Sequence, residues 1–303
     1  MKNLEVQIYK PKETYLLYLD TLKRMLRVVM EDRFGRIGFL IVCFFMFIAI
    51  VGPLIAPYGA YELCYGPEGL LRLKPPSLKY LLGTTYQGRD IFSQLILGTR
   101  LVLIVGFISA FMVVFVGVII GLISGYYGGR IDDILMRITD LIYGIPFLPF
   151  AVVLIPLIGR SVWCTILAIV VIFWRSTARV IRSQTLSLRE RQFVLAARVT
   201  GASHLKIIYK HILPQVLPIS LLYGSFAVGW AVVAEASISF LGLGDPDSIS
   251  WGQVLHYAFI SHGVKSPWWW YIPPGILIQT LVIAVFFIGR SFEIVVNPKL
   301  KDL

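Results

Sequence analysis

Ionisable and nucleophilic side chains are scarce along the apolar part of this chain, and their spacing assembles no familiar reaction centre. Asp140 and Glu235 are the carboxylates nearest to the long apolar runs, and both fall close to run ends. The four histidines lack metal-ligand spacing, and there is no HExxH pair, GxSxG elbow or Walker A loop. Cys43, Cys64 and Cys164 form no CxxC pair. The sequence therefore predicts a chain without bond chemistry, metal or cofactor, which does not bind ATP by the Walker A route.

Composition places the chain in a membrane. Of its 303 residues, 57% are hydrophobic and only 15% are charged, and the mean hydropathy is +0.77. A soluble domain carries about 25% charged residues, and a disordered chain shows the opposite bias. The net charge of +11 would suit a nucleic-acid partner, but such a protein has no need of apolar runs of about 20 residues. The composition favours an integral membrane protein that binds no nucleic acid.

Six apolar segments approach the length of about 20 residues that a helix needs to cross about 30 Å of hydrocarbon. The fourth segment is short, because Arg175 is costly inside the bilayer and reaches the interface only from near a helix end. In the third segment Pro146, Pro149 and Pro156 predict a kink, since each proline lacks a backbone N–H. The predicted spans cover residues 37–56, 101–124, 134–158, 162–176, 212–234 and 272–292.

Basic residues are divided unequally between the two sides of these spans. With the N-terminus in the cytoplasm, 21 of the 28 lysines and arginines lie on the cytoplasmic side and 7 lie outside. The positive-inside rule therefore predicts that both termini are cytoplasmic. The excess positive charge then reflects topology.

The spans divide the chain into a cytoplasmic N-terminal segment, residues 1–36, and a single transmembrane domain, residues 37–303. Leucines alternate with basic residues along 10–36, a spacing that predicts an amphipathic helix on the membrane surface. The transmembrane domain contains an external loop, a long basic cytoplasmic loop and a second external segment, at residues 57–100, 177–211 and 235–271.

Glycines recur at intervals of four on one face of the second span, at Gly117, Gly121 and Gly125. Such a face lets two helix backbones approach closely. We interpret it as helix packing within the bundle, in preference to a role in a substrate path.

The cytoplasmic loop is the most informative segment. Residues 189–200 favour a short helix, Gly201 suits the left-handed position that ends a helix, and Ser203 can cap the next one. Pro214 is expected in the first turn of the fifth span, where its missing donor costs least. Small side chains leave room for another protein to approach, although a basic helix resting on anionic lipid explains the same residues equally well.

This loop closely resembles the EAA motif of ATP-binding-cassette importer permeases, which reads E-A-A-x-x-x-G and continues to x-L-P. Leu195 stands where the motif has glutamate, which removes the polar contact that a glutamate would make. The residues that match in register are Ala196, Ala197, Gly201, Leu213 and Pro214.

Further stretches resemble the dipeptide, oligopeptide and nickel permeases of this family, and in particular their C-type subunit. Residues 82–93 resemble the signature LGTDxxGRDxxS, with Thr85 in place of its aspartate. The other similar stretches are residues 125–129 with Asp132, Arg137 and Asp140, residues 235–244, Ser250-Trp-Gly252 and the closing Asn297-Pro-Lys.

The resemblance implies an all-α bundle of six transmembrane helices, the type I importer permease fold, with cytoplasmic coupling helices. It implies a heterodimer with a second permease, two cytoplasmic ATPase subunits that bind ATP and Mg²⁺, and an extracytoplasmic solute-binding protein. The chain would lie in the cytoplasmic membrane of a prokaryote. The residues that the resemblance assigns to ATPase coupling are Ala196, Ala197, Arg198, Gly201, Ala202, Ser203 and His204.

Candidate residues for the substrate path or for external docking lie near the outer face, at Arg89, Asp90, Glu235 and Trp251. Glu235 has two open roles: contact with a polar solute or basic partner, and an ion pair with Arg89 or Arg100. The external tryptophans suit a membrane-interface belt, with a docking surface as the alternative. Those aromatic residues are Trp251, Trp268, Trp269, Trp270 and Tyr271.

Three questions stay open at this level. The solute of such a permease is a dipeptide or oligopeptide, with nickel and oligosaccharides as alternatives within the family. A secondary carrier or passive channel would also cross the membrane six times, but a coupled carrier needs ionisable groups or broken helices at mid-membrane. A multi-pass membrane enzyme lacks a recognisable nucleophile, metal cluster or acid–base pair here.

Overall fold

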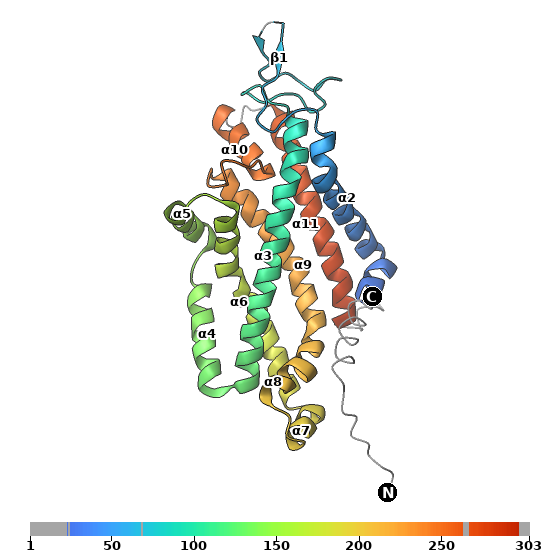
Figure 1. The fold of residues 1–303 in the computed structure, drawn as a ribbon, viewed down its shortest axis with the longest axis vertical. Coiled ribbons are helices and arrows are strands. Elements are labelled where there is room, and N and C mark those ends of the chain that lie inside the picture. Colours follow the sequence, from blue (N-terminus) through green and yellow to red (C-terminus); the bar gives the residue numbers. More distant parts are fainter. Residues whose placement is uncertain (1–22, 24, 68, 263–266, 297–303) are drawn as a thin grey trace.

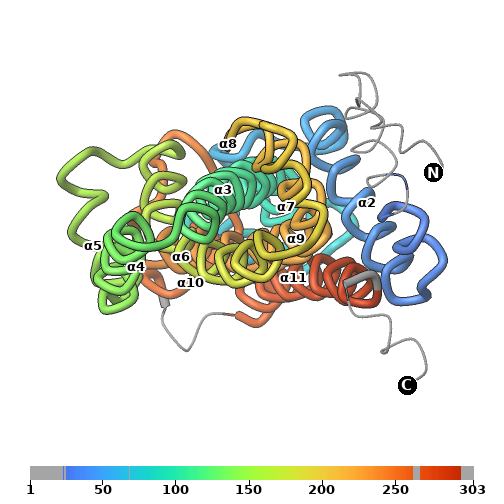
Figure 2. The backbone as a smooth tube through the Cα atoms, turned by 90° about the horizontal axis from the view of Figure 1, so that it is seen from below, coloured from blue at the N-terminus to red at the C-terminus, as the bar shows by residue number. Residues whose placement is uncertain are grey.

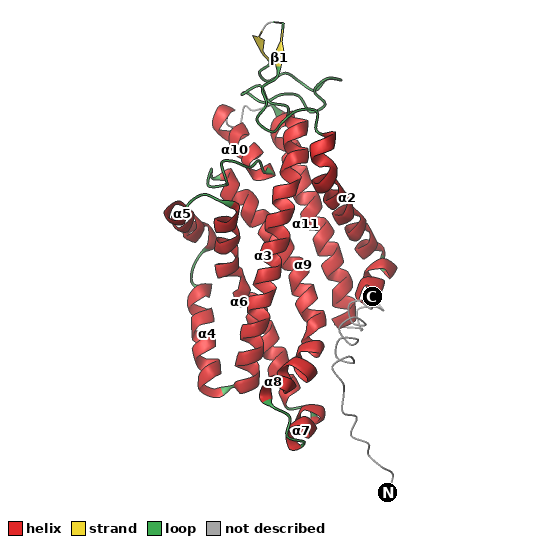
Figure 3. Ribbon diagram, in the orientation of Figure 1, coloured by secondary structure: helices red, strands yellow, loops and turns green. Residues whose placement is uncertain are grey.

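The computed structural model describes residues 23, 25–67, 69–262 and 267–296, and most of them are helical (Figure 3). The predicted amphipathic helix over 10–36 lies largely outside the described residues, although residues 25–31 are helical. The elements are α2 (Arg33–Ile55), β1 (Tyr65–Gly66), β2 (Gly69–Leu70), α3 (Ile91–Tyr127), α4 (Gly129–Tyr143), α5 (Phe147–Ile158), α6 (Val162–Arg189), α7 (Gln192–Val199), α8 (His204–Ile207), the π-helix η1 (Ile208–Ile212), α9 (Leu213–Phe240), α10 (Trp251–His262) and α11 (Trp268–Val296).

The long helices stand side by side in one bundle (Figure 1). One end carries the antiparallel hairpin of β1 and β2, and the opposite end carries α7 and α8. Seen from the α7 end, α4 and α5 form one edge of the bundle, and α2 and α11 lie toward the opposite edge (Figure 2). The hydroxyl of Ser291, near the end of α11, donates to Asp32 at the start of α2, 2.8 Å away. The first and last spans therefore meet at one end of the bundle.

Five helices of the described chain are long and apolar enough to span a membrane, and α4 with α5 supplies a sixth span if that pair counts as one. This agrees with the predicted all-α membrane bundle. The second and fourth spans are much longer than predicted. Helix α3 begins at Ile91, and α6 continues from Val162 to Arg189 instead of ending near Arg175.

The third predicted span, residues 134–158, is not one kinked helix. It consists of α4 and α5, which meet at an angle of 90°. The break falls where Gly144 ends α4 and Pro146 precedes α5, because a residue before proline is driven out of the helical conformation. Pro156 lies inside α5 without breaking it.

Arg175 explains how the break is tolerated at membrane depth. Its Nη1 donates to the carbonyl oxygen of Ile142, 2.5 Å away, and its guanidinium lies 4.6 Å from the ring centroid of Tyr143. The last carbonyl groups of a helix have no partner within the helix and carry a partial negative charge. The arginine therefore satisfies the end of α4, and α6 continues past it because the guanidinium need not reach the interface.

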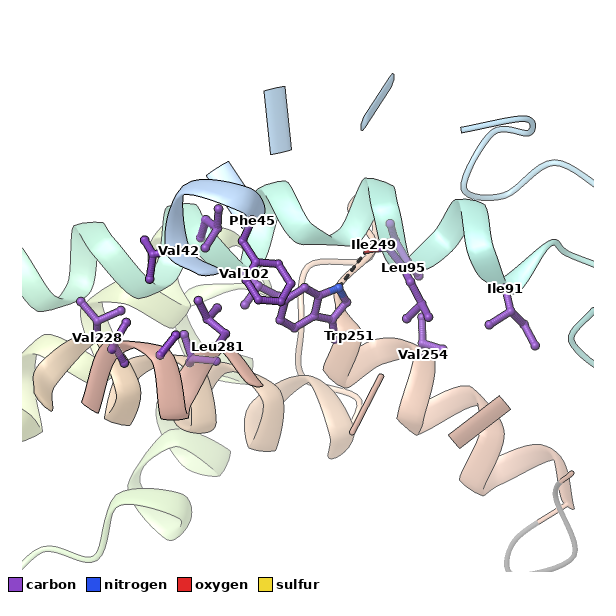
Figure 4. Packing of buried hydrophobic residues seen from close by; sticks show 14 of the residues in the cluster. Val42, Phe45, Ile91, Leu95, Val102, Val228, Ile249, Trp251, Val254 and Leu281 are labelled. Atoms are coloured by element: carbon purple, nitrogen blue, oxygen red, sulfur yellow. Dashed lines mark hydrogen bonds between the residues drawn. The ribbon is translucent and has the colours of Figure 1, made fainter. Parts of the chain in front are cut away.

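The core near the hairpin end is built around Trp251, which is 0% exposed. Its Nε1 donates to the carbonyl oxygen of Leu95 at 2.9 Å, and Phe45 and Leu281 lie beside it (Figure 4). Trp270 is equally buried. The predicted aromatic belt is therefore wrong for these two tryptophans. Large apolar rings fill the space between α2, α3, α10 and α11, whereas Trp268 and Tyr271 are exposed.

The glycine face of α3 packs against α6, as predicted. A Cβ added at Gly117 would lie 2.6 Å from Thr177 Cβ, and one at Gly125 would lie 2.7 Å from Thr185 Cβ. At Gly121 the obstacles include backbone, because the carbonyl oxygen of Ala178 would be 2.7 Å away. Backbone cannot move aside as a flexible side chain can, so α3 and α6 lie at a separation that only glycine permits.

We expect Gly121→Ala to lower the free energy of unfolding by about 1–3 kcal/mol, because overpacking forces the two helices apart. Gly275→Ala in α11 is the matched control, since a Cβ there meets nothing within 4 Å. Thermal unfolding of both variants in detergent checks the difference. Equal midpoints would contradict the role of close α3–α6 packing.

Candidate functional site

Helices α7 and α8 project beyond the end of the bundle that lies opposite the hairpin (Figure 1). The two helices and the turn between them lie between α6 and α9, and together they contain every residue that the sequence assigned to coupling. The turn between them has the predicted geometry. Gly201 has a φ of +78°, its N–H donates to the Arg198 carbonyl at 3.0 Å, and the Ala202 N–H donates to the Ala197 carbonyl at 3.0 Å. This pair of bonds is a Schellman motif, which ends a helix at a left-handed residue.

Ser203 begins the next helix. Its hydroxyl accepts a hydrogen bond from the Lys206 N–H at 3.4 Å, as expected of an N-cap. Pro214 lies in the first turn of α9, as expected. The π-helix over 208–212 ends directly before α9 and joins α8 to it, so that residues 204–240 form one candidate span. The wider turn accommodates a ring that has no N–H and would otherwise clash with the preceding turn.

Residues 192–207, from α7 to α8, are called the coupling segment after their predicted role. Two fully buried side chains anchor this segment to the bundle. Val194 of α7 and Ile207 of α8 pack in one cluster with Leu122 of α3 and Ile181 of α6. Ala197 and Ala202 are half-buried against the same cluster, whereas Ala196 faces solvent. The small residues therefore have two roles. Ala197 and Ala202 let the loop lie close to the bundle, and the short side chain of Ala196 projects little into solvent.

The exposed side of the segment carries four large apolar side chains among polar ones such as Arg198 and Lys206. Val199 is 88% exposed and Leu205 is 74% exposed, and Phe193 and Leu195 are also exposed. Leu195 is the residue that replaces the glutamate of the EAA pattern, and it adds to this apolar surface. A short apolar face on a helix that projects from a membrane bundle is typical of a surface that another protein covers.

Behind the coupling segment lies a cavity of about 360 Å³. The Tyr126 hydroxyl is 2.9 Å from His204 Nδ1, and the Arg198 guanidinium lies 5.4 Å from the Tyr126 ring centroid. Sequence reasoning named Arg198 and His204 but missed the two tyrosines. The Gly125-Tyr-Tyr-Gly-Gly motif was the available signal, and its position relative to His204 depends on tertiary packing. The lining residues are Tyr126, Tyr127, Arg189, Glu190, Arg198 and His204.

Ion pairs next to the coupling segment attach α4 to α6. Arg182 donates from Nε to Asp132 Oδ1 at 2.5 Å and from Nη2 to Oδ2 at 2.6 Å. Such a bidentate contact is geometrically specific. The Ser124 hydroxyl also donates to Asp132, and Arg179 pairs with Asp140. Asp140 therefore lies on the surface in an ion pair, away from the bundle interior.

At the hairpin end, Asp90 is the buried N-cap of α3. Its Oδ2 accepts hydrogen bonds from the Ser93 N–H at 2.8 Å and from the Ser93 hydroxyl at 2.6 Å, and burial raises the pKa of its carboxyl. Arg89 lies over two aromatic rings, with its guanidinium 4.9 Å from the centroid of Tyr61 and 5.9 Å from that of Tyr257. Asp90 and Trp251 are both buried, so neither side chain is open to an external partner in this conformation.

Glu235 is only 1% exposed, near the C-terminal end of α9. The Ser239 hydroxyl donates to its Oε1 at 2.6 Å. The ion pair with Arg89 or Arg100 does not form, because Arg89 is engaged with tyrosine rings and Arg100 is exposed. The carboxylate instead lines a narrow polar crevice between α3, α6 and α9.

Two known protein families together match most of the chain. Residues 117–301 match the binding-protein-dependent transport system inner membrane component, and residues 21–76 match the N-terminal transmembrane domain of oligopeptide transport permease C. A dipeptide transport system permease protein of Bacillus subtilis (strain 168) is 32% identical over 91% of this chain and 85% of its own length. An oligopeptide transport system permease protein of the same organism is 30% identical over 96% of this chain and 92% of its own length.

A third relative, a putative peptide permease protein of Brucella suis biovar 1 (strain 1330), is 33% identical over 89% of this chain and 88% of its own length. Among solved structures, an inward-facing MetNI methionine ABC transporter matches with a TM-score of 0.55. It covers 66% of this chain and 94% of the matched chain, at 21% identity. This likeness supports the importer permease fold.

We expect Ile207→Ala to loosen the coupling segment, because the cavity it leaves costs about 2–5 kcal/mol where the segment meets the bundle. Hydrogen–deuterium exchange of residues 192–207 should accelerate, and trypsin should cleave faster after the exposed Arg198. Leu205→Ala is the matched control, since Leu205 lies on the same helix but faces solvent. Equal exchange in the two variants would show that Ile207 does not anchor the segment.

Proposed function

Because the chain belongs to the family of binding-protein-dependent transport inner-membrane components, the permeases of ATP-binding-cassette importers, we propose that it forms half of a translocation path for dipeptides or oligopeptides. Two relatives support the peptide assignment. They are named as dipeptide and oligopeptide permeases, and the match with this chain covers most of their length. Nickel or an oligosaccharide is the alternative solute. The other half of the path is a second, homologous permease.

The segment from α7 to α8 is the site where this subunit contacts its ATPase. One observation carries this proposal: the segment is anchored on one side and exposes apolar side chains on the other. Val194 and Ile207 form the anchored side, and Val199 and Leu205 lie on the exposed side. Two cytoplasmic ATPase subunits bind ATP and Mg²⁺. When their dimer closes, it pushes on α7, and the buried cluster passes the movement to α3, α6 and α9.

The solute path runs along the face of α6 and α9. A cavity of about 120 Å³ there is lined by Phe173 and Ser176 of α6 and by Tyr223, Phe226 and Trp230 of α9. Trp230 is half exposed on this face, which the second permease would cover. Aromatic rings and hydroxyls suit passage of a polar solute without tight binding.

The hairpin end faces outward, and the α7 end faces the cytoplasm together with both termini. This orientation is supported by the distribution of basic residues and by the contact of Ser291 with Asp32. The outer loop between α2 and α3 exposes Leu78, Leu81 and Tyr65, and it would receive the solute-binding protein.

We expect Gly201→Val to uncouple ATP hydrolysis from uptake. Valine in the left-handed conformation costs at least about 1–2 kcal/mol, which reduces the population of the native turn by about 5–30-fold. The purified complex in proteoliposomes should still hydrolyse ATP but accumulate less labelled peptide per ATP consumed.

Gly159→Val is the matched control for that variant. Gly159 also has a positive φ, +120°, and open space around it, but it lies in the turn after α5. Normal coupling in Gly201→Val would count against the coupling site. Transport by this chain without any copurified ATPase would instead support a carrier or channel.

A further inference from the structure

We propose that the crevice around Glu235 is a binding site for one small monovalent cation of the Na⁺ type. The inference goes beyond the transport function, because it concerns an ion held within the outer end of the bundle. It does not depend on which solute the importer carries.

The first observation is an incompletely satisfied buried carboxylate. Glu235 is 1% exposed, and Ser239 donates to its Oε1. Its Oε2 is buried and has no hydrogen-bond partner among the described residues. A buried carboxylate is normally paired, coordinated to a cation or neutralised. Protonation of Oε2 is the competing way to neutralise this buried charge, and dependence of stability on sodium distinguishes it from a bound cation.

The second observation is the chemistry of the crevice that this oxygen lines. No lysine, arginine or histidine is among the residues around it. Thr165, Ser248 and Ser250 contribute hydroxyls, Gln253 contributes an amide, and the Ser250 hydroxyl lies near the Glu235 carboxylate. Carboxylate, hydroxyl and amide oxygens are ligands for hard cations.

Size and charge select a monovalent ion. The cavity volume is about 10 Å³, which is the space that a single water-sized guest requires. Asp245 also lines the crevice, but its oxygens accept from the Val162 N–H at 3.3 Å and from the Asp247 N–H at 2.9 Å. Asp245 is also partly exposed to solvent, whereas the charge of Glu235 is fully buried, and one positive charge would balance it. The negative end of α9, which ends at Phe240, adds to the attraction.

The bound ion would join three parts of the chain. Glu235 is on α9, Thr165 is in the first turn of α6, and Ser248 and Ser250 belong to the loop before α10. The cation would therefore fix this loop and both helices at the outer face, next to the core around Trp251.

The test compares thermal unfolding of the full transporter complex in nanodiscs in NaCl and in choline chloride at equal ionic strength. Na⁺ should raise the unfolding midpoint of the wild type by about 2–4 °C at saturation, as ligand linkage predicts. Glu235→Gln should abolish this shift and the binding of ²²Na⁺ by this subunit. Glu62→Gln is the matched control, because Glu62 is exposed on the outer loop, and it should retain both.

Equal midpoints of the wild type in the two salts would overturn the proposal, and so would a sodium shift that persists in Glu235→Gln. If Glu235→Gln does not assemble, Thr165→Val replaces it, since that change removes one lining hydroxyl at nearly constant volume. The Na⁺ concentration for half-maximal stabilisation should then rise severalfold, and an unchanged value would overturn the proposal, because it would show that sodium binds outside this crevice.

Discussion

The close contact between α3 and α6 is the constraint on which the rest of the structure depends. Three glycines on α3 allow backbone contact along the half of both helices that lies toward α7, around Thr177 and Thr185. With α6 held there, Arg182 reaches Asp132 and attaches α4, while Arg175 reaches the open end of α4 at the break. In a membrane, where lipid tails are as apolar as leucine, packing of this kind supplies much of the specificity of helix association.

The same contact determines how the coupling segment is presented. Leu122 of α3 and Ile181 of α6 lie in one cluster at the α7 end and, with Val216 of α9, form the base onto which Val194 and Ile207 pack. This cluster joins α7 to three spans at once. The hairpin end is built differently, from buried indole rings and from polar groups such as Asp90 and Glu235, each of which needs a partner inside the protein.

Sequence reasoning was most accurate where a backbone position accepts only a few residue types. Gly201 ends α7 with a positive φ, and Ser203 caps α8, because local backbone chemistry decides both. It failed where a side chain that is unfavourable in its local segment finds a partner far away in the sequence. Arg175 was expected to end its span, but the carbonyl groups of α4 satisfy it, and Trp251 was expected at the interface, but the core of five helices has room for it.

By itself, then, the sequence determined the membrane bundle, the glycine face and the helix–turn–helix between α6 and α9. These follow from hydrophobicity, charge and backbone freedom, which act over a few residues. Only the tertiary structure decided the 90° break between α4 and α5, the ion pair of Arg182 with Asp132, the cavity beside Tyr126 and the isolation of Glu235. Each of these depends on side chains far apart in the chain, whose meeting no local pattern encodes.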